Sequence, residues 1–123
     1  RRYAGVTHID VDALDPDAVH TTMERHGLAI SALAYYPNNL HPDDEHREAV
    51  NGHLRKVFAA AQQLGVEVVG TFVGNDKDRP PPENLARFRQ VWPELVSFAG
   101  ERGSPGRAGS AAPAGAKCKK AIP

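Results

Sequence analysis

The side chains best suited to hold a small polar ligand lie close together after residue 34. Tyr35 and Tyr36 are followed by Pro37 and then by Asn38 and Asn39. Aromatic rings can stack on a sugar-like ring and exclude water, and carboxamides both donate and accept hydrogen bonds. This stretch therefore predicts a loop that binds a polyol. The alternative is that the asparagines only form the turn and that the tyrosines pack against the next helix.

Two further groups of candidate site residues lie at the ends of predicted strands, one earlier and one later in the chain. The earlier group is Asp10 and Asp12, and the later group comprises Thr71, Phe72, Gly74, Asn75 and Asp76. Loops that follow parallel strands converge at one edge of a sheet, so we expect these groups to meet there.

The segment His41–His46 contains two imidazoles and three carboxylates. Such a set of ligands invites a metal interpretation, but Asp43 and Asp44 are explained more simply as the N-cap and first-turn acids of a helix. We therefore interpret the segment as a helix start. The chain has no phosphate-binding glycine loop, no dinucleotide fingerprint and no nucleophile elbow, and Cys118 is its one cysteine.

The charges of the 123 residues cancel overall, with 15 basic and 15 acidic side chains, but they are unevenly placed. Residues 1–99 carry a balance of −4 and residues 100–123 a balance of +4. No run approaches the roughly 20 apolar residues that cross a bilayer, and the first residues show no secretion signal. A single cysteine fits a reducing compartment. We expect a cytoplasmic protein without membrane contact.

Strand-like runs alternate three times with helical patterns in the first 99 residues. The predicted strands are Gly5–Asp12, Leu28–Tyr35 and Val66–Val73, and the predicted helices extend from Asp15 to Gly27, from Asp43 or Asp44 to Gly65, and from Pro80–Pro82 to Ala99. The run Leu28–Tyr35 is apolar throughout, which is typical of a strand covered on both faces. Pro93 lacks a backbone donor and should kink or break the last helix.

The middle helix has the clearest periodicity in the chain. Its expected core positions, at helical spacing, are Val50, Leu54, Val57, Phe58, Ala61 and Leu64. Strands that alternate with such helices pair in parallel, in a barrel or in a doubly wound sheet. Three strands are an incomplete unit of either kind, since a closed barrel needs eight and about 250 residues.

Several segments resemble the sugar phosphate isomerase/epimerase family, the xylose-isomerase-like TIM barrels. They are Gly5–Asp12, Ile30–Asp43, His53–Val66, Val69–Gly74 and Glu83–Phe88. The resemblance covers residues 1–102 and implies a partial (β/α)8 barrel that holds the second, third and fourth strands. It is most specific in Tyr35–Asp43 and Gly70–Gly74.

The resemblance also implies a function. Members of this family shift a proton or hydride between adjacent carbons of an aldose or ketose with a divalent metal such as Mn, Mg, Co or Zn. The segment that should carry the first metal-binding Glu is absent after residue 103, so no metal ligand or catalytic residue carries over, and this chain is expected to bind no metal. By position, the residues that would line the pocket for a sugar or sugar phosphate are Tyr35, Asn38, Asn39, Thr71 and Phe72.

Residues 103–123 differ from the rest of the chain. They are rich in Gly, Pro and Ala, and we expect a disordered basic tail there, separate from the barrel segment at 1–102. One hypothesis is that this tail is read out of frame in a GC-rich gene. The other is a genuine solvated tail, whose few charges and missing aromatics do not favour nucleic-acid binding.

Two hypotheses about the function stay open at this point. The leading one is a fragment of a metal-dependent sugar isomerase or epimerase that is inactive on its own. The alternative is a non-catalytic half-barrel module whose open sheet edges pair with another chain, or with a second copy, to complete the barrel. An endonuclease-type barrel is disfavoured because the folded part is acidic.

Overall fold

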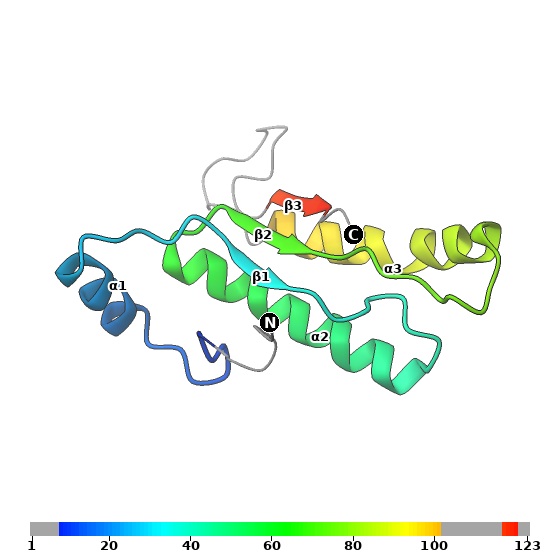
Figure 1. Ribbon diagram of the computed structural model, residues 1–123, viewed down its shortest axis with the longest axis horizontal. Helices are drawn as coiled ribbons and strands as arrows, with labels where there is room; N and C mark the ends of the chain where they lie inside the picture. Colours follow the sequence, from blue (N-terminus) through cyan, green and yellow to red (C-terminus); the bar gives the residue numbers. More distant parts are fainter. Residues whose placement is uncertain (1–7, 102–116, 121–123) are drawn as a thin grey trace, which may run out of the picture.

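The structure is a computed structural model that describes residues 8–101 and the backbone of residues 117–120 (Figure 1). Three helices and three strands follow one another along the chain. They are α1 (Pro16–Arg25), β1 (Leu33–Tyr35), α2 (Asp44–Leu64), β2 (Val68–Thr71), α3 (Pro81–Glu101) and β3 (Lys117–Lys120). The alternation of helices with parallel strands confirms the predicted α/β class. No helix among these residues is long and apolar enough to cross a membrane.

The three strands form one parallel sheet in the order β1-β2-β3. In the register of β1 and β2, Leu33 faces Val69 and Tyr35 faces Thr71. In the described part of the chain, β1 pairs with β2 only. Its outer edge therefore offers unpaired backbone groups.

The strand β3 lies in the segment that we expected to be disordered. Lys117 is the register partner of Val68, and Lys120 that of Thr71. The sequence shows no alternation of apolar side chains in this strand. The strand can form without it, because an open sheet edge pairs through backbone groups that every residue carries. The rest of the predicted tail, residues 103–116 and 121–123, lies outside the described residues, and its disorder stays a prediction.

The predicted boundaries of α1 and α2 are confirmed by their caps. The Asp15 carboxylate accepts a hydrogen bond from the backbone N–H of Ala18, and the Asp43 carboxylate accepts one from that of His46. Gly65 ends α2 with φ of 68°, a left-handed conformation that suits glycine. These local signals need no tertiary context, which explains why the sequence reveals them.

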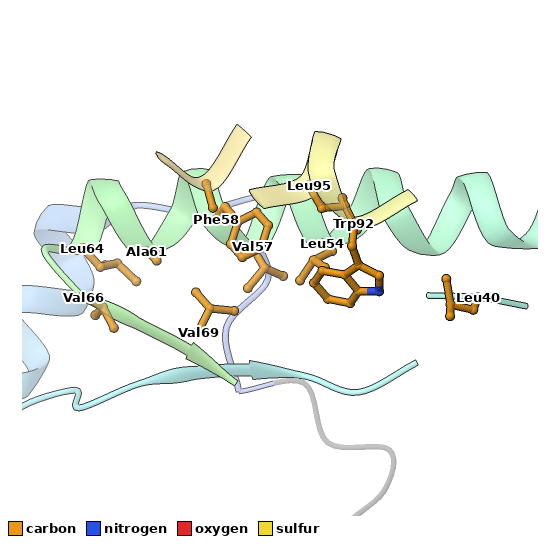
Figure 2. Packing of buried hydrophobic residues seen from close by; sticks show 11 residues of the cluster. Leu40, Leu54, Val57, Phe58, Ala61, Leu64, Val66, Val69, Trp92 and Leu95 are labelled. Carbon is orange, nitrogen blue, oxygen red and sulfur yellow. The ribbon is translucent and has the colours of Figure 1, made fainter. Parts of the chain in front are cut away.

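The core lies between the sheet and the two long helices (Figure 2). All six core positions predicted for α2 are buried. From α3, Trp92, Leu95 and Ala99 pack onto the same cluster, and Val69 of β2 meets them from below. The helix α1, by contrast, lies beyond the sheet and has no buried residue (Figure 1).

Two local predictions about strands were wrong, and one about a helix break was wrong in part. Residues 8–12, the described part of the predicted first strand, form bends and turns, in which the Asp10 carboxylate accepts a hydrogen bond from the N–H of Asp12. Only the last three residues of the run Leu28–Tyr35 are a strand, and Leu28 is 62% exposed, because no partner strand covers this edge in the described region. The helix α3 is not broken at Pro93, which lies within it between the buried Trp92 and Leu95, and a kink at Pro93 stays a prediction.

Candidate functional site

Two loops meet at the carboxyl end of the sheet, one after β1 and one after β2. The side chain of Asn38 in the first loop bonds the main chain of Asn75 in the second. Its Nδ2 donates to the Asn75 carbonyl at 2.6 Å, and its Oδ1 accepts from the Asn75 N–H at 3.0 Å. The same Oδ1 accepts from the N–H of Leu40 at 3.0 Å. Asn38 therefore holds the two loops side by side.

Asn39 makes a second connection from the same loop. Its Nδ2 donates to the Phe72 carbonyl at 2.9 Å and to the Thr71 hydroxyl at 3.2 Å. The residue is fully buried, and its Oδ1 has no hydrogen-bond partner among the described residues. Its own carbonyl accepts from Nδ2 of Asn51 on α2 at 3.1 Å. The first loop is thus fixed to both the sheet and a helix.

Gly74 allows this close approach. Its φ of 89° is a conformation that L side chains rarely adopt. A Cβ at this position would lie 2.7 Å from the backbone nitrogen of Leu40 and 2.9 Å from that of Asn39. Glycine is therefore required here for two independent reasons.

An aromatic pair lies beside these bonds. The rings of Tyr36 and Phe72 are 4.7 Å apart between centroids and tilted by 36°. A Cβ on Gly70 would lie 3.2 Å from the Tyr36 hydroxyl oxygen, so the tyrosine lies across the strand β2. Tyr36 is 48% exposed. The pair forms an accessible aromatic surface on the sheet face that carries Ala34 and Gly70.

Tyr35 and Thr71 belong to the opposite face, which packs on the helices. Strand side chains alternate between faces, and these two residues are register partners. The Tyr35 ring lies 4.5 Å from that of His53 on α2, and Thr71 is only 2% exposed. Burial raises the pKa of the Tyr35 phenol above its ordinary value of 10.0.

The five expected pocket residues thus divide into two sets. Asn38, Asn39, Thr71 and Phe72 are brought together, but the first three are used in bonds within the protein. Phe72 lies on the sheet face that carries Ala34 and Gly70, called the open face below, whereas Tyr35 lies on the opposite face. Tyr36 takes its place on the open face, and only the parity of the strand, which the sequence leaves undefined, distinguishes the two tyrosines.

The second loop is anchored to α3 by a buried acid that we had grouped with the expected site. Asp76 is 4% exposed, and its Oδ2 lies 3.2 Å from Nε of Arg79 and 3.8 Å from Nη1 of Arg87. Its main chain exchanges two hydrogen bonds with the carboxamide of Asn84. Asp76 is thereby explained by loop structure, with its charge compensated by arginine.

Trp92 on α3 adds a further support to the second loop. Its Nε1 donates to the carbonyl of Val73 at 3.0 Å. The helix α3 therefore fixes the loop directly after Phe72, and the same indole fills the core beneath it (Figure 2).

The histidines and the early acids do not join the site. His41 Nδ1 accepts from the N–H of Asp43 at 3.1 Å, and its ring contacts that of His46, with centroids 4.0 Å apart and planes tilted by 39°. Asp12 pairs with Lys56 on α2 at 2.6 Å, and this lysine lowers the pKa of the Asp12 carboxyl through the hydrogen bond and through its charge. The expected meeting of three groups is reduced to two loops.

A comparison with protein families matches residues 3–105 to a family model described as xylose isomerase-like TIM barrel. Comparisons with curated proteins and with solved structures gave no match. The matched range contains both loops, the aromatic pair and all three helices.

Proposed function

This chain belongs to the xylose isomerase-like TIM barrel family, and we propose that it binds a sugar or sugar phosphate on the open face of its sheet. In this proposal it forms part of a sugar isomerase or epimerase barrel. Such barrels bind ligands at the carboxyl ends of their strands. The observation that carries the proposal is the aromatic pair Tyr36–Phe72 at that end, supported by two loops that are bonded to each other.

The chemistry of this surface suits a sugar. A sugar ring has apolar C–H faces that stack on aromatic rings, as well as hydroxyl groups that bind polar atoms at the rim. The exposed Tyr36 supplies both, because its ring carries a hydroxyl that can donate or accept. The rigid loops lower the entropic cost of binding, since the rings are held in place before the ligand arrives.

The metal that the family resemblance implies does not fit the described residues. Among residues 8–101, no group of three His, Cys, Asp or Glu side chains could hold an ion. One ring nitrogen of His41 is already an acceptor for the backbone, and the Asp43 carboxylate caps α2. The proposal therefore includes no metal-dependent step, and we expect the chain alone to bind a sugar without converting it.

Saturation-transfer NMR tests the binding proposal with a panel of aldoses, ketoses and their phosphates. We expect transfer to at least one member from the wild-type chain, and binding about 3- to 10-fold weaker for Tyr36→Ala because stacking energy is lost. The control is Leu85→Ala, which truncates an exposed apolar side chain on α3. Absence of binding to the wild type, or equal binding by Tyr36→Ala, would refute the proposal.

A turnover assay tests the second part. The purified chain is incubated with Mn²⁺ or Mg²⁺ and a panel of ketoses, and no interconversion is expected. Measurable epimerisation would show that the chain carries a complete active site.

A second candidate function is a half-barrel module completed by another chain. It is favoured by the outer edge of β1, which among the described residues has no neighbouring strand. Beside this edge lies an open cavity of about 900 Å³, whose mainly apolar lining includes Ile9, Val11, Val19, Met23 and Leu33. A discrete dimer in size-exclusion chromatography with light scattering would support this module, and a compact monomer would contradict self-pairing.

A further inference from the structure

We infer that Asn39 is a positioning residue for the aromatic pair, fixing the main chain of Phe72 so that its ring meets Tyr36. The inference rests on the proposed function for the consequence, which is ligand binding. The positioning itself is a property of the free chain and can be tested without any ligand.

The bonds of Asn39 continue the sheet beyond its last register pair. The pairing of β1 with β2 ends at Tyr35 and Thr71. The carbonyl of Phe72, directly after β2, instead accepts a hydrogen bond from Nδ2 of Asn39 at 2.9 Å. A side-chain amide thus holds the strand at the point where the backbone ladder stops.

Asn39 is itself held from the side of the helices. Its carbonyl accepts from Asn51 Nδ2 at 3.1 Å, and Asn51 also donates to the carbonyl of Arg47 at 2.6 Å. A continuous series of contacts therefore leads from α2 through Asn39 to Phe72 and on to the Tyr36 ring. Because Asn39 is fully buried, it acts on a ligand only through these neighbours.

The two ends of the carboxamide differ. Both described side-chain bonds of Asn39 are donated by Nδ2, and Oδ1 is buried with no partner among the described residues. An unpaired buried acceptor lowers stability. The amide's contribution to the loop therefore comes from the hydrogens that it donates, which a carboxylate of the same shape cannot supply.

Asn39→Asp tests this directly, because it keeps the shape and removes both donors. NOEs between the ring protons of Tyr36 and Phe72 report the geometry of the pair. We expect them to be strong in the wild type and reduced at least threefold in Asn39→Asp at neutral pH. The comparison variant is Asn51→Ala, which removes an amide on α2 that holds the main chain of Asn39 but leaves both bonds donated by Asn39 Nδ2 in place, and there the NOEs should fall less than in Asn39→Asp.

Full ring NOEs in Asn39→Asp, or an equal loss in Asn51→Ala, would overturn the inference. If Asn39→Asp does not fold, the wild type decides the question. Its Asn39 Nδ2 protons should exchange slowly with solvent and show NOEs to Phe72, and fast exchange without such NOEs would overturn the inference. Ring NOEs that respond as expected while no sugar binds would refute the proposed function and leave the positioning role intact.

Discussion

The side chain of Asn38 pairs with the main chain of Asn75 as one strand pairs with another, through one donated and one accepted hydrogen bond of 2.6 and 3.0 Å. The two residues are 37 positions apart in sequence. Their pairing joins the loops that follow neighbouring strands, at the edge where a parallel α/β protein binds its ligand. The arrangement of this edge is thus a property of side chains as well as of the sheet.

Asn38→Ala should lower the free energy of unfolding by about 1–3 kcal/mol, because it removes three hydrogen bonds to the main chain of the two loops. Urea denaturation measures the change. Asn75→Ala is the matched control, since both bonds that join Asn75 to Asn38 use the main chain of Asn75, and it should change stability by less than about 0.5 kcal/mol. Equal effects of the two substitutions would contradict the described pairing.

Gly74→Ala should destabilise the protein by more than about 2 kcal/mol, because it combines a positive φ with backbone contacts below 3.0 Å.

Gly52→Ala in the middle of α2 gives the opposite expectation. A Cβ there would meet nothing within 4 Å, so alanine should stabilise the helix by about 0.5–1 kcal/mol. Thermal denaturation of both variants tests the pair, and a neutral Gly74→Ala would show that the loops do not approach as described.

Tyr35 should make stability sensitive to alkaline pH. Its folded-state pKa is raised by burial above 10.0, so the folded protein favours the neutral phenol. The stability that the neutral Tyr35 phenol contributes is fully present below the unfolded-state pKa near 10 and is lost as the pH rises through the folded-state pKa. Denaturation midpoints should therefore fall as the pH rises above about 10.

Tyr35→Phe removes the titrating group and keeps the ring that contacts His53. We expect this variant to show a smaller loss of stability above pH 10 than the wild type, with the two midpoints close together at neutral pH. An identical alkaline decline in both proteins would assign the effect to other groups.

The sequence predicts best what is decided locally. The caps Asp15, Asp43 and Gly65 satisfy backbone groups within a few residues of themselves, and the periodic face of α2 is buried as expected. Strand lengths depend on a partner, so Leu28–Ala32 has the composition of a strand without being one, and Lys117–Lys120 is a strand without its composition.

The site shows the same division. The residues at the carboxyl ends of β1 and β2 were predicted to converge, and Asn38, Asn39, Thr71 and Phe72 do so. The choice between Tyr35 and Tyr36 depends on which face each residue takes, and a shift of one residue reverses it. The family resemblance, expected from short motifs, is confirmed by the match over residues 3–105.

The most direct test of sugar binding at the open sheet face is a backbone NMR titration of the wild-type chain with the best sugar of the panel. We expect saturable shift changes at residues 34–39 and 70–76, centred on Tyr36 and Phe72, with the outer surface of α3 around Leu85 and Val96 unaffected. Saturable changes confined to α3, or none at any sugar concentration, would contradict sugar binding at this face.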